Sequence, residues 1–104
     1  MKELNIIINE RIYNDDYFFY SENIDCKTIV EGLSKNFNTK LFARKTAITK
    51  KNKLIFNNIY LSKNFFFFLF NIFLSLKNRK KNIYLLISLT PYTFFSYLML
   101  NSGI

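Results

Sequence analysis

The chain has 104 residues, of which 50% are apolar and 21% charged, and its formal net charge is +8. This length allows one domain, and the apolar content is too high for an intrinsically disordered protein. The single cysteine excludes an intrachain disulfide scaffold, and the absence of histidine excludes imidazole as a catalytic base or metal ligand.

The charges are divided unevenly along the chain. All seven acidic residues lie in residues 1–31, which carry a net charge of −4, whereas residues 32–104 carry +12 and no acid. This asymmetry indicates an anionic partner or an anionic membrane surface for the second half. Genome composition is the alternative explanation, because Ile, Asn, Lys, Phe and Tyr are abundant here and all have AT-rich codons.

The first elements are short. Leu4–Ile8 is β-branched and apolar, which predicts a buried strand. Asn14–Asp16 is typical of a turn. The adjacent acids Asp15 and Asp16 could also be a pair of metal ligands, but a turn is favoured because no third ligand is nearby. Tyr17–Tyr20 is either a short strand or an aromatic flap.

The clearest helix spans residues 24–38. Asn23 or Asp25 is a suitable N-cap, although Gly32 weakens the middle of the helix. A strand follows within residues 39–46. The helix is predicted from one apolar face at helical spacing, formed by Cys26, Ile29, Val30, Leu33 and Phe37.

The second half continues the alternation of helices and strands. Thr90 and Pro91 are a favoured N-cap and first residue of a helix, and Gly103 suits the end of that helix. The strand–helix order predicts an α/β layer fold with a mostly parallel sheet. The expected elements are a polar turn at 50–53, a strand at 54–60, a mostly buried helix at 64–77, a strand at 83–89 and a helix at 92–101.

A membrane protein is the alternative architecture. Residues 82–104 form 23 uncharged residues, which is long enough to span a bilayer, but residues 64–76 form only 13. With the basic loop Lys77–Lys81 on the cytoplasmic side, the two segments would make a small two-helix integral membrane protein without catalysis. Thr90 and Pro91 within the longer segment favour the α/β fold instead.

Candidate ligand-binding residues follow from the expectation that ligands bind beyond the carboxyl ends of strands. Glu10 is a candidate base or hydroxyl acceptor, and Arg11 a candidate phosphate ligand. The alternatives are a surface salt bridge or a solvated loop for these two residues, and simple helix capping for Thr90. No glycine-rich nucleotide motif is present. The candidates are Asn9, Glu10, Arg11, Thr90 and Tyr92, and Arg44 and Lys45 follow the second strand.

Three segments resemble the N-terminal, acceptor-side Rossmann-like domain of a GT-B glycosyltransferase: Leu4–Glu10, Thr28–Lys45 and Ile83–Leu100. The resemblance implies a Rossmann-like, mostly parallel sheet with flanking helices, in a partial single domain over residues 1–104. It also implies transfer of a sugar from a nucleotide-sugar donor to a glycan or lipid-linked acceptor. The donor belongs to a second domain, so we expect no cofactor, no metal and no transfer activity in this chain alone.

The resemblance also implies where in the cell the protein works. Such enzymes work in the cytoplasm, often peripherally on the inner membrane face, where basic side chains contact anionic lipid. The chain departs from the family in lacking both the glycine-rich turn after the first strand and any histidine. No nucleic acid is expected, because no nucleic-acid motif is recognisable. The membrane-surface candidates are Lys63, Lys77, Arg79, Lys80 and Lys81.

Overall fold

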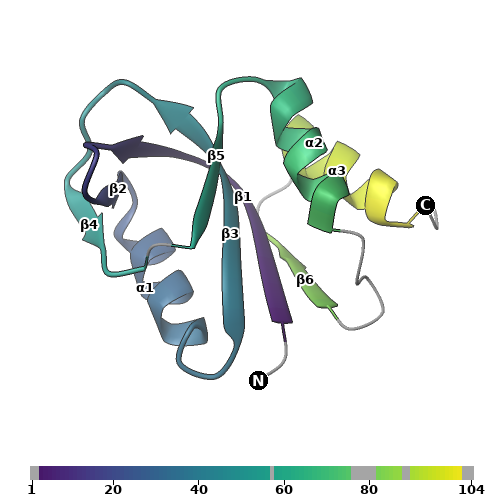
Figure 1. Cartoon of the computed structure of the whole chain (residues 1–104), viewed down its shortest axis with the longest axis horizontal. Helices are drawn as coiled ribbons and strands as arrows, with labels where there is room; N and C mark the ends of the chain where they lie inside the picture. The colour runs from purple at the N-terminus through teal and green to yellow at the C-terminus, as the bar shows by residue number, and fades with distance from the viewer. Residues whose placement is uncertain (1–2, 57, 76–81, 88–89, 102–104) are drawn as a thin grey trace.

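A computed structural model describes residues 3–56, 58–75, 82–87 and 90–101 of the chain (Figure 1). Its strands form one twisted sheet, with α1 on one face and α2 and α3 on the other. The elements, in chain order, are β1 (Glu3–Asn14), β2 (Phe19–Ser21), α1 (Ile24–Leu33), β3 (Asn38–Thr46), β4 (Asn52–Leu54), β5 (Ile59–Ser62), α2 (Phe65–Ser75), β6 (Asn82–Leu86) and α3 (Pro91–Asn101).

The strand β1 is the centre of the sheet. One of its edges pairs with β3 in parallel, and β5 extends the sheet beyond β3. Its other edge is shared: Glu3–Ile7 pairs with β6 in parallel, whereas Ile12–Asn14 pairs with β2, which runs antiparallel. The strand β4 pairs antiparallel with β2. One edge of β1 therefore has two partners, β6 along its first half and β2 along its last residues, and these two strands separate from each other.

The predicted fold class is wrong. The structure is a mixed six-stranded sheet with three short helices, not a Rossmann-like parallel sheet with flanking helices. The antiparallel strands β2 and β4 make the difference, and the prediction contained neither pairing. The chain reverses after β1, so that β2 folds back on the same strand before α1 begins.

The reversal is made by the predicted turn at Asn14–Asp16. Asp16 has a φ of 82°, a left-handed conformation that Asp tolerates better than most residues. The Asn14 Oδ1 accepts the Asp16 amide at 2.9 Å, and the Asp15 Oδ1 accepts the amides of Tyr17 and Phe18 at 3.1 and 2.8 Å. The bonds that the Asp15 carboxylate accepts, with that from the Phe18 amide as the largest cause, hold the pKa of Asp15 below its usual value.

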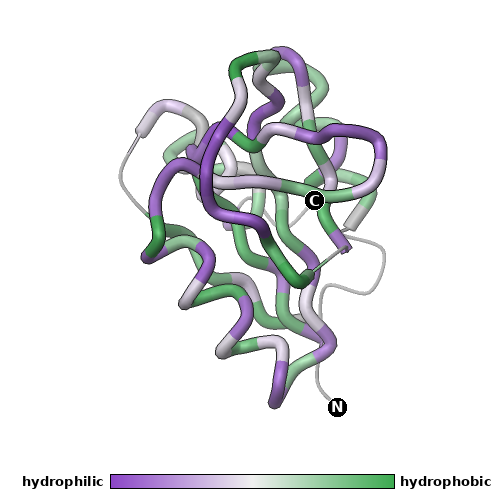
Figure 2. Tube along the Cα trace, turned by 90° about the vertical axis from the view of Figure 1, so that its left-hand side faces the viewer, coloured by the Kyte–Doolittle hydropathy of each residue, from purple (hydrophilic) through white to green (hydrophobic). Residues whose placement is uncertain are grey.

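Alternate residues of β1 serve two hydrophobic cores. The core beneath α1 contains Ile6, Ile8 and Ile12 of β1 together with Cys26 and Val30 of the helix. Figure 2 shows hydrophobic and hydrophilic residues alternating along α1, with mainly hydrophobic strands behind it. The amphipathic pattern of this helix therefore correctly predicts that Cys26 and Val30 are buried, whereas Ile29 of the same predicted face is 38% exposed.

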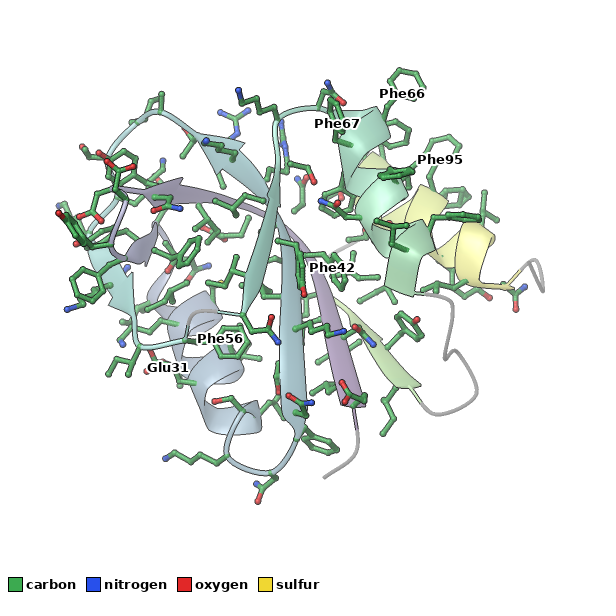
Figure 3. The ribbon with its side chains drawn as sticks, viewed as in Figure 1. Glu31, Phe42, Phe56, Phe66, Phe67 and Phe95 are labelled. Atoms are coloured by element: carbon green, nitrogen blue, oxygen red, sulfur yellow. The ribbon has the colours of Figure 1, made fainter. Side chains whose placement is uncertain are left out.

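The second core lies beneath α2 and α3. Ile7 of β1 and Phe42 of β3 pack there against Phe68 and Ile72 of α2. Phe42 lies between β3 and α2 in Figure 3, and its ring stacks on that of Tyr60 with centroids 5.3 Å apart. This core joins the first half of the chain to the second.

Several element boundaries differ from the prediction. The helix α1 ends at Leu33, although its apolar pattern continues to Phe37. The Phe37 amide still donates to the Leu33 carbonyl at 3.1 Å, within turns that lead into β3. The predicted turn at 50–53 contains the start of β4, and the predicted strand at 54–60 is divided between β4 and β5.

Some sequence predictions lie outside the described residues. These are the final residues of the predicted helix at 64–77, residues 88–89 of the predicted strand, and Gly103. The helices α2 and α3 have 11 residues each. Within the described part of the chain, no helix is long and apolar enough to cross a membrane.

Two phenylalanines of α2 offer a matched test of the second core. Phe68 is fully buried, whereas Phe66 is 80% exposed. We expect Phe68→Ala to lower the free energy of unfolding by about 3–5 kcal/mol through lost burial and a cavity. Phe66→Ala should change it by less than about 0.5 kcal/mol. Urea unfolding of both variants measures the difference, and equal losses would contradict the packing of α2.

Candidate functional site

A bulge in β1 lies where its two edge partners diverge. The register with β3 pairs Ile7 with Phe42 and then Arg11 with Arg44, so three residues of β1 oppose Ala43 alone. Bulges bend a strand and redirect its side chains. Figure 1 shows β1 bending towards β2 and away from β6 over this stretch. The divergence opens the sheet edge beside the carboxyl end of β6.

A pocket of about 290 Å³ occupies this opening, and we call it the fork pocket. It lies between the bulge of β1, the first turns of α1, and the residues Ile87 and Thr90. The helix α1, which follows the β1–β2 hairpin, and the helix α3, which follows β6, lie on opposite faces of the sheet, an arrangement that leaves a crevice in open sheets. Its lining residues are Ile8, Asn9, Glu10, Asn23, Asp25, Cys26, Ile29, Val30, Ile87 and Thr90.

Glu10 connects the bulge to the start of α1. Its Oε1 accepts the Asn23 amide at 3.3 Å. The Asn23 side chain in turn caps α1, because its Oδ1 accepts the Asp25 amide at 2.8 Å. The carboxylate of Glu10 is thus positioned by the N-terminal end of a helix, where negative charge is favoured.

Thr90 supplies the opposite wall and caps α3. Its amide donates to the Thr93 Oγ1 at 2.9 Å, and the Thr93 amide donates to the Thr90 Oγ1 at 3.4 Å. This reciprocal pair follows the logic of a capping box. The capping role that the sequence suggests is therefore present, and the same residue also lines the fork pocket.

Cys26 lies in the apolar part of the fork pocket and is not an activated thiol. Burial, with a smaller contribution from the charge of Glu10, raises the pKa of Cys26 to about 12. A thiol becomes a good nucleophile only as the thiolate. Cys26 therefore serves as a small core residue, as its position on the apolar face predicts.

The structure brings together three of the five candidate residues. Asn9, Glu10 and Thr90 line the fork pocket. Arg11 is exposed and does not line it. Tyr92 belongs to α3, but its side chain lies outside the described residues. Among the membrane-surface candidates Lys63 is exposed, and Lys77, Arg79, Lys80 and Lys81 lie outside the described residues.

The salt bridge suggested for Glu10 and Arg11 is not formed. Strand alternation turns adjacent side chains to opposite faces, and the Glu10 carboxylate bonds to the Asn23 amide instead. Among the described residues the ion pairs are Lys27–Glu31 at 2.6 Å and Lys50–Glu22 at 3.2 Å. The described residues contain no cluster of three metal-ligating side chains.

Sequence reasoning missed the contribution of α1 to the site. Asn23 and Asp25 lie in the first turn of this helix and line the fork pocket. The expectation that ligands bind beyond the carboxyl ends of strands, here called the carboxyl-end rule, pointed only to the residues that directly follow each strand. A helix that follows a strand also begins near that edge, so the N-cap signal at Asn23 was the available clue.

The polar groups of the fork pocket are mainly acceptors. Glu10 and Asp25 contribute carboxylates to the lining, and Ile8, Ile29 and Val30 contribute apolar side chains. The Asn9 amide oxygen accepts from Arg44 and is not free for a ligand in this pocket. Two carboxylates disfavour an anionic ligand and favour one that donates hydrogen bonds. The arrangement suits a neutral molecule with several hydroxyl groups and an apolar face.

A second pocket of about 400 Å³ lies beside β2 and β4. The Lys53 amine lies 3.5 Å from the centroid of the Phe18 ring. Apart from that amine and the Tyr17 hydroxyl, the side chains that line it are hydrocarbon. Binding sites orient their ligands through several convergent polar groups, which this pocket lacks, so the fork pocket is the better candidate despite its smaller volume.

No family model, curated protein or solved structure matches the chain. The assignment of a site therefore rests on the geometry of this chain alone.

The thiol of Cys26 provides a test of the fork pocket. With a pKa near 12, it should resist iodoacetamide in the folded protein at a pH near the ordinary thiol pKa of 9.0, and react readily in urea. Glu10→Gln removes the repelling charge, so it should lower this pKa and speed the reaction of the folded protein. Mass spectrometry measures the rates, and equal rates in folded and unfolded protein would contradict the burial.

The same pKa sets a pH dependence of stability. Between pH 9.0 and 12 the unfolded thiol is ionised while the folded thiol keeps its proton. The unfolded state then binds fewer protons, so the contribution of Cys26 to the free energy of unfolding falls as pH rises through this window.

Proposed function

We propose that the chain binds a glycan in the fork pocket, as the acceptor-side part of a sugar-transferring enzyme. The observation that carries the proposal is the set of acceptor groups placed beside apolar side chains in one pocket. A sugar ring presents hydroxyl donors around its rim and C–H groups on its face. The hydroxyl groups can donate to the carboxylates of the lining, and the C–H groups can pack on its apolar side chains.

The size of the pocket supports a small part of a glycan as the ligand. Small-molecule sites have volumes of roughly 300–1,000 Å³, and the fork pocket at about 290 Å³ lies at the lower end. One terminal sugar ring suits this space, with the rest of the acceptor in solvent. A nucleotide-sugar donor carries phosphate groups, which Glu10 and Asp25 would repel, so we assign the donor no place in this pocket.

Nuclear magnetic resonance tests the proposal directly. We expect N-acetylglucosamine, added to ¹⁵N-labelled protein, to shift the amide signals of Glu10, Asn23 and Thr90. Glu10→Gln exchanges a strong acceptor for an amide and should weaken binding by about tenfold, because a hydrogen bond to a charged group contributes about 1.5–3 kcal/mol.

Glu22→Gln is the matched control, because Glu22 bonds to Lys50 and lies outside the fork pocket. It removes the same charge and should leave sugar binding unchanged. Absence of shifts with N-acetylglucosamine, glucose and galactose up to their solubility limits would refute glycan binding. Equal weakening by both variants would refute the placement of the sugar in the fork pocket.

A second function, attachment to an anionic membrane surface, is favoured by the outer face of α2 and α3. Figure 3 shows Phe66, Phe67 and Phe95 directed away from the sheet. Contiguous exposed apolar surface of this kind marks an interaction site. We call this surface the aromatic face, and it comprises Phe66, Phe67, Phe70, Phe73, Leu74, Phe94, Phe95, Tyr97 and Leu98, each between 44% and 80% exposed.

The positive charge of residues 32–104 indicates an anionic partner for the aromatic face. Residues 32–104 contain twelve basic residues and no acid, and exposed Lys63 lies two residues before α2. Aromatic rings enter the lipid interface, and each basic residue near an anionic surface adds about 1 kcal/mol. An anionic phospholipid bilayer complements both properties.

Vesicle flotation tests this attachment. We expect binding to vesicles of phosphatidylglycerol and phosphatidylcholine, and weaker binding to phosphatidylcholine alone. The double variant Phe66→Ala with Phe67→Ala should lose most of the binding, since these rings are 80% and 59% exposed. The control Tyr17→Ala with Ile55→Ala alters side chains that are 84% and 83% exposed elsewhere and should keep it. Equal binding by both double variants would overturn the proposal.

A further inference from the structure

Two arginines lie side by side on the face of the sheet that α2 and α3 cover. Arg11 of β1 is the register partner of Arg44 of β3, and paired residues direct their side chains to the same face. The neighbouring pair, Ile12 and Lys45, belongs to the other face, because Ile12 is buried in the core beneath α1. The two guanidinium groups therefore share one surface at the carboxyl ends of β1 and β3.

Like charges at directly opposed positions destabilise a sheet unless something neutralises them. The Arg44 Nη1 donates to the Asn9 Oδ1 at 3.3 Å, which positions the guanidinium without changing its charge. In the described part of the chain, the Arg11 side chain forms neither a hydrogen bond nor an ion pair. The adjacent acid, Glu10, faces α1, and residues 32–104 contain no acid at all.

We propose that Arg11 and Arg44 together bind a phosphate group. Guanidinium groups present planar pairs of N–H donors that match phosphate oxygens, and two of them side by side match a phosphate monoester or a diphosphate. Ser62 of β5 continues the same register row beyond Arg44, and exposed Lys63 follows it. The site therefore lies at the carboxyl ends of the neighbouring strands β1 and β3.

This site is distinct from the fork pocket. Arg11 and Arg44 do not line that pocket, and its carboxylates favour a neutral ligand. Asn9 is the residue common to both, since it lines the fork pocket and bonds to Arg44. Phosphate binding by Arg11 and Arg44 does not require glycan binding in the fork pocket, and thermal unfolding measures it separately.

Thermal unfolding with inorganic pyrophosphate tests the site. At matched ionic strength, pyrophosphate should raise the melting temperature of the protein above its value in sodium chloride, because a ligand that binds only the folded state stabilises it. Arg11→Gln should weaken pyrophosphate binding at least about tenfold, as expected for a lost charged hydrogen-bonding group. Lys35→Gln, a change of equal charge at an exposed lysine after α1, should bind as the unaltered protein does.

Arg11→Gln has a second consequence that a merely structural arginine would not produce. Without pyrophosphate and at low salt, this variant should melt at the same temperature as the unaltered protein or higher, because the like-charge pair is gone, and added salt should reduce the difference. A lower melting temperature of Arg11→Gln without ligand, or equal stabilisation of Arg11→Gln and Lys35→Gln by the ligand, would each overturn the proposal.

The source of the phosphate group is decided by a second probe. Dihexanoyl phosphatidic acid offers the same group on a soluble lipid. Stabilisation by pyrophosphate supports the site and indicates a free phosphate compound. Stabilisation by the lipid alone, lost in Arg11→Gln, supports the site and indicates a lipid headgroup. Stabilisation by neither refutes it.

Discussion

The fold depends on the parallel pairing of β1 with β3. This pairing brings residues 3–14 beside residues 38–46 and leaves α1 to cross one face of the sheet. Ile6 and Ile7 are both fully buried, one in each core, so a single strand supports the packing of all three helices. A slip of one residue would exchange these two faces, which fixes the register strongly.

The bulge in β1 places the polar groups on either side of the sheet. Three residues of β1 oppose Ala43, and the strand changes partner from β6 to β2 over the same stretch. Glu10 consequently reaches the N-terminus of α1, whereas Arg11 lies beside Arg44 on the other face. Adjacent residues in sequence thus contribute to two environments of opposite charge, one that favours hydroxyl donors and one that favours anions.

Local signals in the sequence predict many elements correctly. The turn at Asn14–Asp16, the N-cap of α1 and the start of α3 at Pro91 follow from short-range chemistry. The end of α1 was predicted too late, because apolar spacing continues past Leu33 although the helix does not. The carboxyl-end rule found Asn9, Glu10 and Thr90, but it could not find Asn23 or Asp25, which reach the pocket only through the packing of α1.

By itself, the sequence determined the position of the three helices and of β1, β3 and β6 to within a few residues, and the division of charge between the two halves. Those properties depend on neighbours a few residues apart. Only the tertiary structure decided that β2 and β4 join the sheet antiparallel, that β1 bulges, and that Arg11 faces Arg44. Each of these depends on hydrogen bonds between distant segments, whose partner and register no local pattern specifies.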